Sequence, residues 1–118
     1  MTKQDSYHIA IHEDSVKNYF KAWGEKSIKN LSGLLSEDVV LKDWEINVSG
    51  IKNVLEANSK IFTSVQKLDV SVESLAFNEN IAFCKITVHA DDDKIPVVDI
   101  LEFNSNGKIE KITAYRGN

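Results

Sequence analysis

Three polar side chains in this chain of 118 residues are predicted to point toward an apolar interior. Tyr19 falls within the apolar stripe of a predicted helix, in which hydrophobic residues recur at steps of three and four. Asp99 is the one acid on an otherwise apolar strand face, because successive strand residues point to opposite sides. Asp43 follows two apolar residues on its own strand face, at the rim of a core or in solvent. A buried carboxylate is costly unless it is paired or protonated, so these residues are candidates for chemistry.

If the three side chains line one cavity, their surroundings give them different roles. Apolar walls raise the pKa of Asp99 because they favour the neutral carboxylic acid, and a neutral acid can donate a hydrogen bond. Together with the hydroxyl of Tyr19, it would form an oxyanion site with two donors. Asp43, closer to the rim and better hydrated, would stay ionised and act as a general base.

Each of these residues also has a purely structural explanation. A buried tyrosine usually donates its hydroxyl to a backbone carbonyl, and a single strand aspartate is more often part of a hydrogen-bond network than a catalyst. Asp43 would fit equally well as a solvated acid at the end of a strand. The residue types and their spacing leave both interpretations open.

Three helices are predicted in the first half of the chain. The first runs from about residue 9 to residue 23, and Gly24 follows its C-terminal end. Ser27 is the expected N-cap of a short second helix. A third helix begins after Ser49-Gly50 and extends to about Ser64, with an apolar stripe along one face.

The remaining segments are predicted to be strands. Residues 36–38 are expected to break the chain after the second helix, and residues 39–48 to form the first strand. Four further strands follow the third helix, at residues 68–77, 81–90, 97–103 and 108–115. This order predicts a single α+β domain over residues 1–118, with a curved mixed or antiparallel sheet that carries three helices on its concave face.

Composition and charge argue against several classes of protein. With 42% hydrophobic and 27% charged residues, the chain has an ordinary globular composition. No apolar run approaches the roughly 18 to 20 residues of a membrane span, and no signal-type segment follows Met1, so we expect a cytoplasmic protein without membrane contact. A formal charge of -4 and a single arginine, Arg116, argue against a nucleic-acid partner. Cys84, the one cysteine, is expected to be a small buried hydrophobe.

No metal or cofactor is predicted. His8 and His12 lie one helical turn apart, but a third metal ligand is not evident near them. The acidic turn at residues 91–93 lacks the spaced ligands and the glycine of a calcium loop. The chain also contains no phosphate-binding glycine loop and no nucleophile elbow.

The strand that carries Asp99 is apolar on both faces, since Val98 and Ile100 point away from that acid. We therefore expect the central strands to be covered on both sides. The helices can cover one side, and a second copy of the chain is the simplest cover for the other. A homodimer is predicted.

Several segments resemble the SnoaL-like and ketosteroid-isomerase-like branch of the NTF2-like superfamily. They are Val16–Tyr19, Leu41–Asp43 and Val97–Phe103, the last with the turn and the Lys108-Ile109 pair that follow it. The resemblance extends from about His8 to Gly117 and includes the order of the elements. It implies the cone-shaped NTF2-like fold. Trp44 stands where the isomerases usually have a proline, and Asn58 replaces a supporting tyrosine, which argues against a steroid as the substrate.

The resemblance also implies an activity and the residues that perform it. By this match, Tyr19 and Asp99 donate hydrogen bonds to an enolate oxygen, while Asp43 carries a proton between two carbon atoms. The implied function is cofactor-independent proton transfer next to a carbonyl, as in an isomerase or a polyketide-cyclase-like enzyme, on a small apolar ligand. The pocket is expected to be lined by Trp23, Phe62 and Phe103. Two alternatives stay open, namely a pocket that binds an apolar ligand without converting it and a dimeric assembly module.

Overall fold

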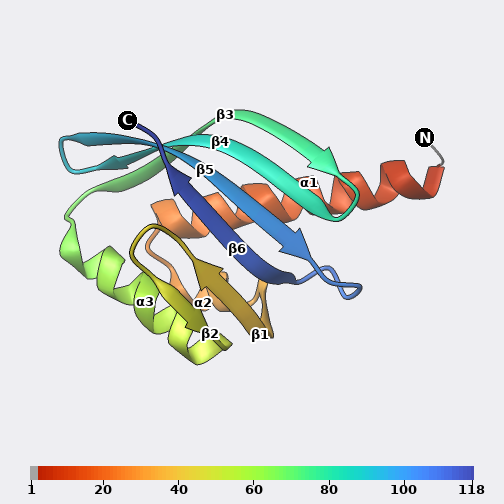
Figure 1. Ribbon diagram of the computed structural model, residues 1–118, viewed down its shortest axis with the longest axis horizontal. Helices are drawn as coiled ribbons and strands as arrows, with labels where there is room; N and C mark the ends of the chain where they lie inside the picture. Colours follow the sequence, from red (N-terminus) through yellow and green to blue (C-terminus); the bar gives the residue numbers. More distant parts are fainter. Residues whose placement is uncertain (1–2) are drawn as a thin grey trace.

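Three helices lie against a curved sheet of six strands, as Figure 1 shows. The computed structural model describes the backbone of residues 3–118 and the side chains of residues 12–118. The strand order is β2-β1-β6-β5-β4-β3, in which β1 and β6 are parallel and all other neighbours are antiparallel. The sheet is therefore mixed and not closed into a barrel, and the predicted α+β class is confirmed.

The predicted helices are present. Their bounds are Lys3–Gly24 for α1, Ile28–Ser32 for α2 and Ile51–Ser64 for α3. Ser27 caps α2 as expected, because its Oγ accepts a hydrogen bond of 3.1 Å from the backbone N–H of Asn30. Gly50 precedes α3 with φ of 89°, a left-handed conformation that only glycine adopts without strain.

Four of the predicted strands are found within a few residues of their expected ends. The six observed strands are β1 Leu35–Lys42, β2 Asn47–Ser49, β3 Leu68–Asn78, β4 Ile81–Ala90, β5 Asp93–Phe103 and β6 Ile109–Arg116. In Figure 1, β2 and β3 form the two edges, α1 crosses behind the strands and α3 lies beside β1 and β2.

The prediction of one continuous strand over residues 39–48 is wrong. The chain turns after β1 and returns as β2, so that Leu41 pairs with Val48 in an antiparallel hairpin. Asp43 causes this turn, because its Oδ1 accepts hydrogen bonds from the backbone N–H groups of Glu45 at 2.7 Å and Ile46 at 2.6 Å. A side-chain oxygen that bonds the next backbone donors replaces a ladder bond and reverses the chain.

Residues 36–38 also differ from the prediction, because they belong to β1 and do not separate it from α2. Leu35 already pairs with Ile109 of β6, and the register of this parallel pair shifts before Val40. Ser36 donates its hydroxyl to Asp38 Oδ1 at 2.8 Å, so polar residues occupy an irregular part of the strand.

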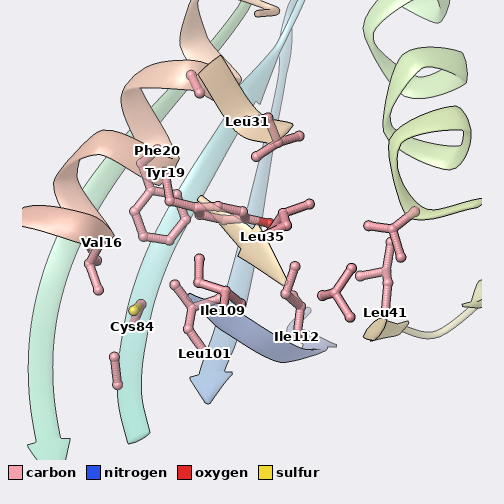
Figure 2. Close-up of a cluster of buried hydrophobic side chains, with 14 of the residues drawn as sticks. Val16, Tyr19, Phe20, Leu31, Leu35, Leu41, Cys84, Leu101, Ile109 and Ile112 are labelled. Carbon is pink, nitrogen blue, oxygen red and sulfur yellow. The ribbon is translucent and has the colours of Figure 1, made fainter. Parts of the chain in front are cut away.

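The hydrophobic core fills the space between the helices and the concave face of the sheet. Figure 2 shows part of this cluster, in which Val16 and Tyr19 of α1 face strand residues such as Leu101 and Ile112. The alternation along β5 is as predicted, since Leu101 is fully buried and Val98 is 39% exposed. Burial of each such apolar side chain contributes about 1.5–3 kcal/mol, so this cluster fixes the inward face of every central strand.

No helix within residues 3–118 combines the length and the apolar character needed to cross a membrane. Among the side chains of residues 12–118, no group of three or more His, Cys, Asp or Glu residues is placed to hold a metal ion. The side chain of His8 lies outside the described residues. His12 is buried, and its ring stacks on Phe103 with the ring centroids 4.3 Å apart.

Candidate active site

A cavity of about 350 Å³ lies between α1, α3 and the concave face of the sheet. This volume is at the lower end of the range for pockets that hold small molecules. Most of the wall is apolar, and it comes largely from β3, β4, β5 and β6. The polar exceptions include Tyr19 and Trp23 from α1, Asn58 from α3, Asp99 from β5 and Asp43 from the turn after β1.

The sheet register explains why Asp43 and Asp99 reach the same cavity. Lys42, the last residue of β1, pairs with Thr113 of β6, and the next residue of β6, Ala114, pairs with Asp99 of β5. The chain therefore leaves β1 at the level of Asp99, two strands away. With neighbouring strands about 4.8 Å apart, the two acids stand about 10 Å apart at their Cα atoms. Asp43, Asp99 and Ala114 all line the cavity, so the two acids share it.

Tyr19 is 2% exposed, and its ring packs edge-on against Phe20 with centroids 5.2 Å apart. Its hydroxyl, the red atom in Figure 2, points away from α1 into the interior. Burial raises the pKa of this hydroxyl well above its usual value, and the nearby Asp99 carboxyl raises it further, while the Trp23 side chain, placed to donate a hydrogen bond to the hydroxyl, acts to lower it. The group therefore keeps its proton at physiological pH and is available as a hydrogen-bond donor.

Asp99 is 9% exposed, and no described residue donates a hydrogen bond to its carboxyl group. Burial raises its pKa from 3.8 to about 7, and the charge of Asp43 adds to the increase. A substantial share of Asp99 is therefore a neutral acid near pH 7. Cys84 pairs with Asp99 across β4 and β5, and burial followed by the Asp99 charge raises the pKa of its thiol to about 12, so it is no nucleophile.

Asp43 is half-buried, and its carboxylate both holds a turn and lines the cavity. Its Oδ1 holds the β1–β2 turn through the two backbone hydrogen bonds described above, whereas Oδ2 takes part in neither bond. One carboxylate oxygen is thus structural, and the residue still lines the cavity. The structural and the catalytic interpretations of Asp43 are compatible with each other.

Of the three aromatic residues expected to line the pocket, only Trp23 does so. Phe62 lies behind Trp23, with its ring at 90° to the indole and the centroids 5.1 Å apart. Phe103 stacks on His12 at the far end of β5, where α1 covers the strand. Both phenylalanines are buried core residues, whereas the residues of β5 that line the cavity extend from Asp99 toward Ile95.

The polar residues of the cavity wall also include Asn58 and Arg116, which were not among the predicted site residues. Asn58 is 1% exposed, and neither atom of its amide has a hydrogen-bond partner among the described residues. Arg116 lies at the rim with its guanidinium carbon 6.0 Å from the centroid of the Trp44 ring, within range of a cation–π contact. Asn58 interrupts an apolar helix stripe just as Tyr19 does, so the same argument could have singled it out.

The SnoaL-like domain family matches residues 16–112 of the chain. No curated protein sequence matches it. Solved structures similar in fold include a protein from Kribbella flavida that is provisionally named a ketosteroid isomerase. The two share 17% sequence identity with a TM-score of 0.80, over 92% of this chain and 79% of that chain.

Two further solved structures have different named activities. A protein from Shewanella denitrificans, provisionally named a SnoaL-like polyketide cyclase, shares 17% identity with a TM-score of 0.80 over 91% of this chain and 90% of that chain. An epoxide hydrolase of the LEH-like type from M. tuberculosis shares 12% identity with a TM-score of 0.76, over 92% of this chain and 84% of that chain. At these identities the likeness shows the fold alone, which is the NTF2-like cone.

Proposed function

The chain belongs to the SnoaL-like domain family, and we propose that it is an enzyme that transfers a proton next to a carbonyl group of a small molecule. The observation that carries this proposal is the state of Asp99. Its carboxyl group is buried on the cavity wall and accepts no hydrogen bond from a described residue. It lies close enough to Tyr19 to raise the pKa of that hydroxyl, and close enough to Asp43 for the charge of Asp43 to raise its own pKa. A structural aspartate would have donors, whereas an acid that donates to a ligand has none in the free protein.

The proposed reaction uses groups of the chain itself and no cofactor. A ketone oxygen accepts hydrogen bonds from the Tyr19 hydroxyl and from the neutral Asp99 acid. The Asp43 carboxylate removes a proton from the adjacent carbon, and the electron pair of that C–H bond moves into the enolate, whose negative charge the two donors stabilise. In an isomerase, Asp43 then returns the proton to another carbon. In a cyclase, the enolate carbon attacks a second carbonyl of the same molecule, the π electrons of that carbonyl move to its oxygen, and this oxygen takes up the proton held by Asp43.

Binding of enolate mimics tests the donor pair. We expect 2-naphthol and a series of phenols to bind the wild-type protein saturably, because their oxygens resemble an enolate oxygen. Tyr19→Phe and Asp99→Leu each remove one donor and should weaken binding about tenfold or more. If the folded wild-type protein binds none of these compounds, or if both variants bind them as well as the wild type, the oxyanion site does not exist.

A second candidate function is binding of an apolar ligand without conversion, and the use of Asp43 Oδ1 in the β1–β2 turn favours it. Exchange of the α-hydrogens of small cyclic ketones in D₂O separates the two functions. An enzyme exchanges them at a rate that Asp43→Asn lowers, whereas a carrier binds the ketone and leaves the exchange rate of free ketone unchanged.

We also propose that the chain forms a homodimer through the outer face of its sheet. Val98 and Tyr115 are paired neighbours on β5 and β6 and are 39% and 60% exposed, on the face opposite Asp99. Val98→Lys should shift the protein toward the monomer in light scattering, because it puts a charge into an apolar interface. Val72→Lys is the matched control, since Val72 is 44% exposed but pairs with the cavity residue Ile86 and so lies on the other face. Equal masses for the wild type and both variants would contradict this interface.

A further inference from the structure

Asn58 is a buried polar residue that the structure leaves without hydrogen bonds. It lies near the middle of α3, is 1% exposed and lines the cavity. Neither its Nδ2 donor nor its Oδ1 acceptor has a partner among the described residues. A buried amide that makes no hydrogen bond destabilises the folded protein, so its position on a cavity wall indicates a ligand that supplies the bonds.

Trp23 adds a third polar group on the same side of the cavity. Its indole Nε1–H is buried on the cavity wall beside the Tyr19 hydroxyl, and it makes no hydrogen bond of good geometry with any described residue. Phe62, one helical turn after Asn58 on α3, packs edge-on against the Trp23 ring with centroids 5.1 Å apart, which holds the indole beside α3. Trp23 and Asn58 therefore form a polar region on the helical wall, whereas Asp99 and Asp43 belong to the sheet side.

We propose that Asn58 and Trp23 are a hydrogen-bonding subsite for a hydroxyl group of the ligand. The subsite offers two donors, Asn58 Nδ2–H and Trp23 Nε1–H, and one acceptor, Asn58 Oδ1. A hydroxyl group has two acceptor positions and one donor, so it complements all three. A ketone or a carboxylate has no donor for Asn58 Oδ1, and an ammonium group has no acceptor for the two N–H groups.

This inference rests on the proposed function for the other end of the ligand, whose carbonyl oxygen lies between Tyr19 and Asp99. The cavity of about 350 Å³ is small enough for a compact ligand to reach both the sheet side and the helical wall. The substrate class is therefore a small hydroxylated carbonyl compound.

The test compares 2-naphthol, which has one hydroxyl, with the isomers of dihydroxynaphthalene, which have two. We expect at least one isomer to bind the wild-type protein about tenfold more tightly than 2-naphthol, because the second hydroxyl meets the unused groups. Asn58→Leu should reduce this ratio to about one. Asn53→Leu is the control, because Asn53 is an exposed asparagine on the same helix whose amide bonds the Ser49 carbonyl and does not line this cavity.

Thermal unfolding without ligand gives an independent measurement. Asn58→Leu should raise the Tm by about 3 to 6 °C more than Asn53→Leu does, since only the first change removes an unpaired buried amide. The proposal is overturned if Asn58→Leu lowers the Tm, if no dihydroxynaphthalene binds more tightly than 2-naphthol, or if Asn58→Leu keeps the wild-type ratio.

Failure of this inference can be told from failure of the proposed function. If Asn58→Leu keeps the ratio while Tyr19→Phe weakens binding of both classes of probe equally, the hydroxyl subsite is wrong and the oxyanion site stands. If Tyr19→Phe and Asp99→Leu leave 2-naphthol binding unchanged while Asn58→Leu removes the preference for two hydroxyls, the proposed function is wrong and the subsite stands.

Discussion

Replacement of Asp99 by asparagine should stabilise the protein at alkaline pH. The pKa of this buried carboxyl is about 7 in the folded state, against an ordinary value of 3.8. Between about pH 4 and pH 7, the folded state therefore keeps a proton on Asp99 that the unfolded state has already released. Its stability is highest at low pH and falls as the pH rises from about 4 to about 7, because an ionised Asp99 must then be kept out of water.

The size of this effect follows from the two pKa values. Each pKa unit corresponds to about 1.4 kcal/mol, so the difference of roughly three units costs the folded state about 4 kcal/mol once Asp99 is fully ionised. That is a large part of the roughly 5–15 kcal/mol that stabilises a typical domain. Asp99→Asn keeps the shape of the side chain and has no charge, so it removes this penalty above pH 7 and changes little near pH 4.

Urea unfolding at pH 5, 6, 7 and 8 measures the difference, with tryptophan fluorescence as the signal. We expect the free energies of unfolding of the wild type and Asp99→Asn to diverge up to about pH 7 and the difference then to level off, with the variant the more stable by several kcal/mol at pH 8. Asp92→Asn, at an exposed turn position, is the control and should follow the wild type. Parallel curves for the wild type and Asp99→Asn, or a variant that is less stable at pH 8, would refute a buried acid without partners.

Two further predictions concern the acids that hold turns. Asp43→Asn should lower the α-hydrogen exchange rate at least a hundredfold, because the base is lost. The free energy of unfolding should change by less than about 1 kcal/mol, because the amide oxygen still accepts the two hydrogen bonds of the turn. A variant that unfolds would assign Asp43 to structure alone. Asp91→Ala should lower the free energy of unfolding by about 1–3 kcal/mol in urea, because Asp91 Oδ1 accepts hydrogen bonds from the backbone N–H groups of Gln66 and Lys67, both at 2.9 Å. An unchanged urea midpoint would show that these hydrogen bonds do not stabilise the fold.

Local pattern was sufficient for most of the fold and for the burial of two candidate residues, Tyr19 and Asp99. The strict alternation along β5 placed Asp99 on the buried face, and the steps of three and four along α1 placed Tyr19 in the core. Both predictions depend only on the spacing of apolar residues along one helix or one strand, and this spacing is visible in the sequence. The four strands of the second half were predictable for the same reason.

The β1–β2 turn was not predictable from period alone. Apolar residues continue to alternate through Trp44 and Ile46, so the pattern of residues 39–48 is that of one strand. The chain turns there because a single side chain, Asp43, bonds two backbone N–H groups that a strand would pair elsewhere. On its other side β1 pairs with β6, about 70 residues away, and no local pattern indicates that pairing.

The shape of the cavity was also beyond the sequence, because it depends on how the helices lie over the sheet. Phe62 and Phe103 have the residue type of a pocket wall but are covered by neighbouring aromatic rings. Asn58 has the residue type of a surface position but is fully buried on the cavity wall. Periodicity shows which face of a helix points inward, and it does not show whether that face meets a side chain or an open space.

The protonation of Asp99 in the presence and absence of an enolate mimic tests the central claim most directly. Side-chain ¹³C NMR, with the signal assigned by its loss in Asp99→Asn, follows this carboxyl group from pH 4 to pH 9. We expect a midpoint near 7 in the free protein and a clear upward displacement with saturating 2-naphthol, because a bound oxyanion favours the acid that donates to it. A midpoint below 5, or one that 2-naphthol leaves unchanged, would contradict the donor role of Asp99 and with it the proposed oxyanion site.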